Sequence, residues 1–121
     1  MPDYQLLTAA LRQQLLANAR APDEDHVPLV KLFNPAGPAT WLASELDPDG
    51  VLFGLADLGM GCPELGSFSL AELAALRLPF GLRIERDLHF STDQPISVWA
   101  DTARSTGSIP AAERLLARLR R

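Results

Sequence analysis

The chain has 121 residues, 47% of them hydrophobic, with a formal net charge of −4 and a single cysteine, Cys62. A chain of this length buries roughly two-thirds of its surface on folding, which is enough for one core without disulfides or metals. A lone cysteine fits a reducing compartment. No apolar run approaches the roughly 18–20 residues that a membrane span requires, and the N-terminus does not resemble a secretory signal. We therefore expect a cytoplasmic protein and exclude membrane, fibrous and disulfide-framework classes.

The N-terminal part has the pattern of an amphipathic helix over residues 3–20, with Asp3 as its N-cap. Leu7, Leu11 and Leu15 recur at every fourth position, which forms an apolar stripe along one side of a helix. The polar segment that follows, 21–26, is typical of a connector between elements.

Three strand-like runs come next, at 29–33, 39–46 and 51–58. The residues between them are rich in Asn, Asp, Pro and Gly, which favour turns. Short loops between consecutive strands predict an antiparallel meander. We expect one further short strand at 66–68.

The second half of the chain opens with a capping box. Ser69 and Glu72 have the spacing at which each side chain caps the other's backbone N–H, which predicts a helix from 70 to 77. An extended segment is expected over 82–90, followed by a turn or short helix that contains Trp99.

The end of the chain is predicted to form a separate unit. Small and polar residues at 105–108 indicate a flexible linker, and 109–121 has the pattern of an amphipathic helix. We expect 1–104 to form one α+β domain, in which the N-terminal helix packs on a small antiparallel sheet. The last helix either docks on that sheet or meets a partner, so both a monomer and a homodimer stay open.

Short motifs occur in a specific order between residues 31 and 90. They are KLFNP at 31–35, TW at 40–41, ELDP at 45–48, FGL at 53–55, ELG at 64–66, FSLAEL at 68–73 and GLRIERDLHF at 81–90. In these motifs the chain resembles a family of short uncharacterised bacterial proteins found on plasmids, integrative elements and phages, with a family-like core over 28–100. The resemblance implies a mobile-element accessory protein and no particular reaction.

One segment carries candidate catalytic residues. If 82–90 is extended, Glu85, Asp87 and His89 lie on one face. Two carboxylates and an imidazole could bind a divalent metal or supply a general base, as in a metal-dependent, nuclease-like enzyme. The alternative is a half-exposed strand with a solvated polar face. Because metal sites usually combine ligands from distant segments, we favour the second interpretation and predict no metal or cofactor.

The Gly-rich segment 59–63 raises a second catalytic possibility. Cys62 could act as a nucleophile with His89 as its base. Nothing in the sequence lowers the pKa of this thiol, and the alternative is a tight loop whose glycines adopt positive φ. We favour the loop.

Charge is distributed unevenly along the chain. Residues 21–66 contain eight acids and one base, Lys31, whereas 77–121 contain eight arginines and five acids. The acidic region predicts a binding site for a protein partner that has a basic surface. The candidate residues of this site are Glu45, Asp47, Asp57 and Glu64. The second leaves nucleic-acid binding as an alternative. The function that we predict is a non-enzymatic protein-interaction module.

Overall fold

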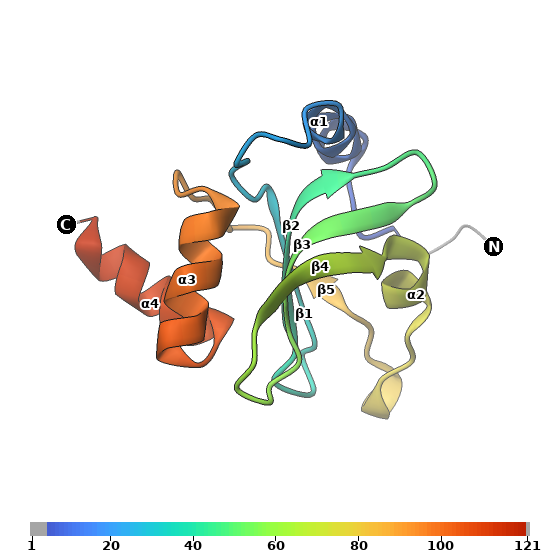
Figure 1. Cartoon of the computed structure of the whole chain (residues 1–121). Helices are drawn as coiled ribbons and strands as arrows, with labels where there is room; N and C mark the ends of the chain where they lie inside the picture. Colours follow the sequence, from blue (N-terminus) through green and yellow to red (C-terminus); the bar gives the residue numbers. More distant parts are fainter. Residues whose placement is uncertain (1–4, 121) are drawn as a thin grey trace.

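The computed structural model describes residues 5–120 and has an α+β fold (Figure 1). The elements in chain order are α1 (Ala9–Ala19), β1 (Val30–Phe33), β2 (Thr40–Leu46), β3 (Val51–Asp57), β4 (Glu64–Ser69), α2 (Leu70–Ala75), the 3-10 turn η1 (Pro79–Gly81), β5 (Glu85–Arg86), α3 (Ile96–Thr106) and α4 (Ile109–Leu119). Both the α+β class and the N-terminal helix on an antiparallel sheet are confirmed.

The strands form one five-stranded sheet in the order β4-β3-β2-β1-β5. Every neighbouring pair is antiparallel. The predicted meander is therefore present in β1 to β4, and β5 returns to the free side of β1. A bulge between Ala43 and Glu45 shifts the register of β2 against β3.

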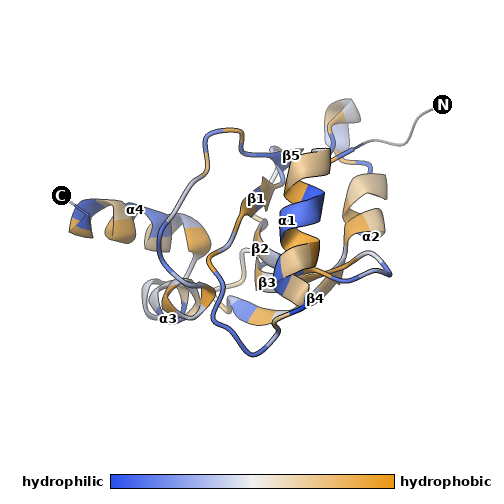
Figure 2. Cartoon of the chain, turned by 90° about the horizontal axis from the view of Figure 1, so that it is seen from above, coloured by the Kyte–Doolittle hydropathy of each residue, from blue (hydrophilic) through white to orange (hydrophobic). Residues whose placement is uncertain are grey.

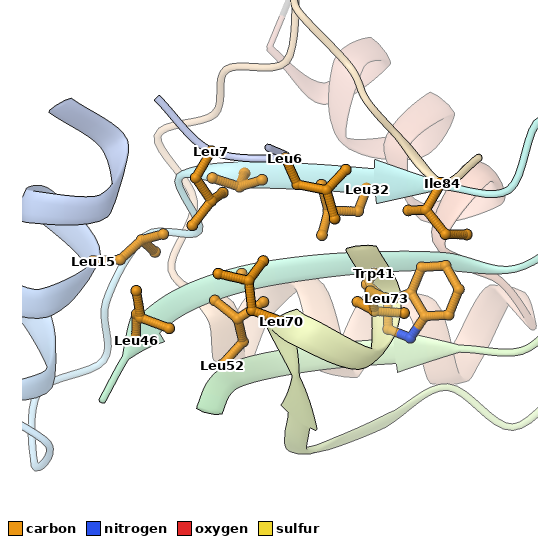
Figure 3. Packing of buried hydrophobic residues seen from close by; sticks show 12 residues of the cluster. Leu6, Leu7, Leu15, Leu32, Trp41, Leu46, Leu52, Leu70, Leu73 and Ile84 are labelled. Atoms are coloured by element: carbon orange, nitrogen blue, oxygen red, sulfur yellow. The ribbon is translucent and has the colours of Figure 1, made fainter. Parts of the chain in front are cut away.

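Helices cover both faces of the sheet. Seen from above, α1 and α2 lie on one side and α3 and α4 on the other (Figure 2). Each side has its own hydrophobic core. The α1-side core includes Leu15, Leu32 and Leu52, all completely buried (Figure 3). The α3-side core includes Leu42 of β2 and Leu55 of β3, from the other face of the sheet.

The last helix docks on its own domain. Ile109, Ala112 and Leu116 of α4 are buried in the α3-side core, with Leu42 and Leu55 of the sheet. These three side chains face the chain's own core, whereas Leu119 in the last turn is 71% exposed. Within residues 5–120, no helix has both the length and the apolar character needed to cross a membrane.

The N-terminal helix is shorter than the sequence predicts. It begins at Ala9, where the Thr8 hydroxyl caps it by accepting a hydrogen bond from the N–H of Leu11 at 3.1 Å. The predicted cap, Asp3, lies outside the described residues. Leu6 and Leu7 precede the helix and are buried in the α1-side core, so part of the predicted apolar stripe is buried by a non-helical segment.

The segment 105–108, expected as a flexible linker, is made of helix ends and caps. Ser105 and Thr106 end α3, and Gly107 terminates it at φ 93°. The Ser108 hydroxyl then caps α4 by accepting a hydrogen bond from the N–H of Ala111 at 3.1 Å. Glycine directly after one helix and serine directly before the next are the residues usually found at helix C-termini and N-caps, so this segment is a tight turn between two helices.

The segment 82–90 is mostly not extended. Only Glu85–Arg86 pairs as a strand, and Asp87 then turns the chain by accepting a hydrogen bond from the N–H of His89 at 2.9 Å. An aspartate whose side chain bonds to the backbone two residues further on competes with strand pairing.

Strand β4 is longer than the sequence predicts, because it extends beyond 66–68 at both ends. The predicted Ser69 cap of α2 is confirmed: the Ser69 hydroxyl accepts a hydrogen bond from the backbone N–H of Glu72 at 3.1 Å.

Candidate functional site

The outer edge of β4 presents backbone groups that no other strand uses. The N–H of Leu70 donates to the carbonyl of Gly50 at 3.1 Å, and among the strands of residues 5–120 β4 pairs with β3 only. In an antiparallel ladder, successive residues point their backbone groups alternately toward and away from the neighbour. The N–H and C=O groups of Leu65 and Ser67 therefore point away from β3, and no described group bonds to them.

This edge differs from the opposite one. β5 is two residues long, consists of Glu85 and Arg86, and is followed by the turn at Asp87. Short length and charge are the usual protections of an edge strand against pairing with another chain. β4 has six residues, contains no proline, and carries one charged side chain, Glu64, at its first position. The β4 edge thus lacks the protection that β5 has.

Acidic side chains surround the β4 edge. Glu64 is exposed on β4 itself, and Glu72 is exposed in the first turn of α2. Ser67 lines a depression of about 310 Å³ together with Glu45 and Asp47. Burial raises the pKa of Glu45 above its usual range, and the nearby His26 opposes that shift. Carboxylates therefore lie at both ends of β4, at Glu64 and Glu72, and two more line the depression that Ser67 borders.

Asp57 does not belong to this surface, contrary to the prediction. Its side chain is 1% exposed. One carboxylate oxygen accepts a hydrogen bond from the N–H of Gly59 at 2.9 Å, and the other accepts from the N–H of Ile109 at 2.8 Å. The sequence prediction missed this role because Ile109 is 52 residues away along the chain.

Glu45 and Glu64 do not lie on one face of the sheet. Glu64 pairs with Ala56, which packs on the α1-side core, whereas Glu45 pairs with Phe53. Phe53 follows Leu52 of that core, and successive residues of a strand point to opposite faces. The predicted acidic residues therefore do not form one flat patch: Glu64 lies on the edge strand β4, and Glu45 lies two strands inward on β2 and on the other face.

The candidate catalytic residues of 82–90 do not converge. Glu85 and His89 are exposed, and Asp87 contacts the ammonium of Lys31 at 3.5 Å while it caps the turn at His89. In the described part of the chain, no group of three or more His, Cys, Asp or Glu side chains is arranged to hold a metal.

Cys62 and His89 lie at opposite ends of the sheet. Cys62 is exposed in the β3–β4 loop, beyond the end where Asp57 pairs with Thr40. His89 follows the turn after β5, beyond the other end of β1, because β5 runs antiparallel to β1. His89 therefore cannot serve as the base for Cys62. As predicted, Gly59 and Gly61 adopt positive φ.

The sequence itself carries a signal for the β4 edge. The run from 64 to 69 contains one charge and no proline, which is unusual for an unpaired edge. Its position at the edge, however, follows only from the strand order.

Comparison with known proteins gives one match. A family model described as "Protein of unknown function (DUF2958)" matches residues 6–110. No curated protein and no solved structure matches the chain. The matched range takes in all five strands and α1, α2 and α3, and it ends in the first turn of α4. The β4 edge and the acids around it lie inside the matched range.

Proposed function

Since the chain belongs to the DUF2958 family of proteins of unknown function, we propose its function from its surface: it is a non-enzymatic protein-interaction module that binds an extended segment of a partner protein along β4. The row of free backbone groups at Leu65 and Ser67 carries this proposal. The proposal includes an origin in a mobile genetic element, which the motif resemblance implies.

The binding mode is the addition of a strand to the sheet. An extended peptide can bond to the outward N–H and C=O groups of Leu65 and Ser67 and continue the ladder that β3 and β4 begin. The side chains of the bound peptide would alternate between the two faces of the sheet, so that they lie beside Leu65 on the α3 side and beside Phe68 on the α1 side. Main-chain bonds supply affinity in this mode, and the side chains supply specificity.

The charge around β4 favours a basic partner. Glu64 and Glu72 lie at the two ends of the strand, and Glu45 and Asp47 lie across the depression that Ser67 lines. Lysine or arginine residues in the bound segment would meet these carboxylates. Complementary surface charges increase the rate at which the two proteins associate, and salt screens the attraction between these charges. We therefore expect the binding to weaken as ionic strength rises.

The direct test is a proline at an outward-facing position. The chain is used to select binders from displayed random peptides, and the selected peptide is titrated against Ser67→Pro and Ser67→Ala. Proline removes the outward N–H and places its ring against the incoming strand, while the bonds to β3 use other residues. Ser67→Ala keeps the N–H. We expect Ser67→Pro to weaken binding at least about tenfold and Ser67→Ala to leave it unchanged.

Two results would overturn the proposal. The first is that no peptide is selected. The second is that a selected peptide binds Ser67→Pro and Ser67→Ala equally well. Backbone amide shifts recorded during the titration provide an independent readout, because strand addition must perturb the amides of Leu65 and Ser67.

The enzymatic alternative has no comparable support. It needs Glu85, Asp87 and His89 to act together, and Asp87 is engaged by Lys31 and by its own turn. The nucleic-acid alternative relies on the arginine-rich C-terminal portion, 77–121, in which Arg114 and Arg118 of α4 and the cap residue Arg120 are exposed. The same titration with a single-stranded oligonucleotide in place of the peptide distinguishes this alternative.

A further inference from the structure

A groove lies between the segment that precedes α1 and the segment around β5. Its volume is about 390 Å³, and its walls include these residues: Leu6, Leu82, Arg83, Glu85, Arg86 and Leu88. Sites for small molecules in proteins usually have volumes of about 300–1,000 Å³. The groove therefore has room for a small ligand.

The guanidinium of Arg86 is oriented at the wall of this groove. Its Nε donates to the carbonyl of Leu6 at 3.0 Å, and both residues line the groove. Arginine also carries N–H donors on its two terminal nitrogens. No hydrogen bond or ion pair joins these nitrogens to another group of residues 5–120. The half-buried Arg86 side chain can therefore bind an acceptor in the groove without breaking an existing contact among these residues.

The charge of the groove is positive. Arg83 lines it as well and is held by its hydrogen bond to the carbonyl of Ala74. Glu85 directly precedes Arg86 in β5, and successive residues of a strand point to opposite faces, so the Glu85 carboxylate points away from the Arg86 guanidinium. Two guanidinium groups against one carboxylate leave the lining positive in a chain whose net charge is −4. The groove is thus complementary to an anion.

Apolar side chains line the rest of the groove. Leu6 is buried, Leu82 is half-buried and Leu88 is 73% exposed. An apolar group that covers Leu88 removes its side chain from water, which is favourable. A ligand that fits both parts of the groove therefore combines a negative charge with an apolar body.

We propose that this groove binds a small carboxylic acid with an apolar body, whose carboxylate accepts two hydrogen bonds from the terminal nitrogens of Arg86. The forked guanidinium matches the two oxygens of a carboxylate. A phosphate group carries close to two charges and three acceptor oxygens, more than this fork and the one excess positive charge of the lining satisfy. Because the Leu6 carbonyl already orients the guanidinium, little additional ordering is lost on binding.

This site is independent of the proposed peptide binding. β5 and β4 are opposite edges of the sheet, so a ligand beside β5 leaves the outward groups of Leu65 and Ser67 accessible. Either proposal can therefore fail without the other.

The test compares an acid with its neutral counterpart on the full wild-type chain. Phenylbutyrate and phenylbutanamide have the same apolar body and differ in charge. Each is titrated while backbone amide shifts are recorded. We expect phenylbutyrate to shift the amides of Leu82, Arg86 and Leu88, and the amide compound to bind at least about tenfold more weakly.

Substitutions at Arg86 identify the group that holds the carboxylate. Arg86→Met keeps an apolar stem and removes the charge, and Arg86→Lys keeps the charge and removes the fork. We expect Arg86→Met to weaken phenylbutyrate binding at least about tenfold and Arg86→Lys to weaken it less. The matched control is Arg114→Met, at an exposed arginine of α4, which should leave the binding unchanged.

Three results would overturn the inference. They are groove amides that do not shift with phenylbutyrate up to about 20 mM, equal binding of the acid and the amide compound, and an Arg86→Met variant that binds the acid as tightly as the wild type does. The first two use the wild-type chain, so they test the inference even if Arg86→Met does not fold.

Discussion

The carboxylate of Asp57, the last residue of β3, accepts a hydrogen bond at 2.8 Å from the backbone N–H of Ile109, the first residue of α4. A negative charge at a helix N-terminus satisfies an otherwise free N–H and is favoured by the helix dipole. The other oxygen of the same side chain accepts from Gly59 in the β3–β4 loop. One buried carboxylate therefore connects the sheet, a loop and the C-terminal helix.

Replacement of Asp57 is expected to loosen α4. Asp57→Ala leaves the N–H groups of Gly59 and Ile109 without their acceptor, and we expect a loss of about 2–4 kcal/mol in the free energy of unfolding. Urea denaturation followed by circular dichroism measures it. Asp57→Asn is the matched control, because one amide oxygen can still accept one of the two bonds, and its loss should be about half. A loss below about 0.5 kcal/mol for Asp57→Ala would contradict this role.

Gly59 and Gly61 provide a paired test of close packing in the β3–β4 loop. Both have positive φ, 84° and 79°. A Cβ at Gly59 would lie 2.3 Å from Cγ of Pro38, whereas a Cβ at Gly61 would meet nothing within 4 Å. We expect Gly61→Ala to cost about 1 kcal/mol through its backbone alone, and Gly59→Ala to cost at least about 1 kcal/mol more. Thermal unfolding of the two variants measures the difference. Equal losses would show that the Pro38 contact is not tight.

Lys31 connects β1 to α4 and to the turn after β5. Its ammonium lies 2.7 Å from Glu113 and 3.5 Å from Asp87, and its side chain is 15% exposed. Lys31→Met keeps the apolar stem and removes the charge, and we expect a loss of about 1–2 kcal/mol because two partly buried carboxylates lose their partner. A double-mutant cycle with Glu113→Gln isolates the pair. The coupling should fall in high salt, and a coupling near zero at low salt would argue against the contact.

Glu45 should make stability depend on pH in the acidic range. Burial raises its pKa in the folded protein above the ordinary value of 4.5. The folded state then binds more protons than the unfolded state in the window above that value, so stability falls as pH rises through it. We expect Glu45→Gln to remove this part of the pH dependence and to be relatively more stable near neutral pH. The effect is measured from the urea midpoints of unfolding of the wild type and Glu45→Gln at several pH values. Glu64→Gln, a substitution at an exposed glutamate, is the control. Parallel profiles for wild type and Glu45→Gln would contradict it.

The sequence by itself determined those features that depend on residues close together in the chain. The runs around β1, β2 and β3, the Ser69 cap of α2 and the positive φ of Gly59 and Gly61 follow from strand alternation, side-chain capping and turn chemistry. Each acts over a few residues, so the order of residues is sufficient to predict it.

Only the tertiary structure decided what each charged or apolar side chain faces. Asp57 has the same local pattern as an exposed strand residue, and it is buried because α4 packs over it from 52 residues away. The apolar residues of α4 fit a partner as well as a core, and Ile109, Ala112 and Leu116 pack in the core that contains Leu42 and Leu55. Among the described strands, β4 keeps an unpaired edge because β5 pairs with β1 and not with β4. Burial and strand order arise from packing between distant segments, and local sequence patterns do not contain that information.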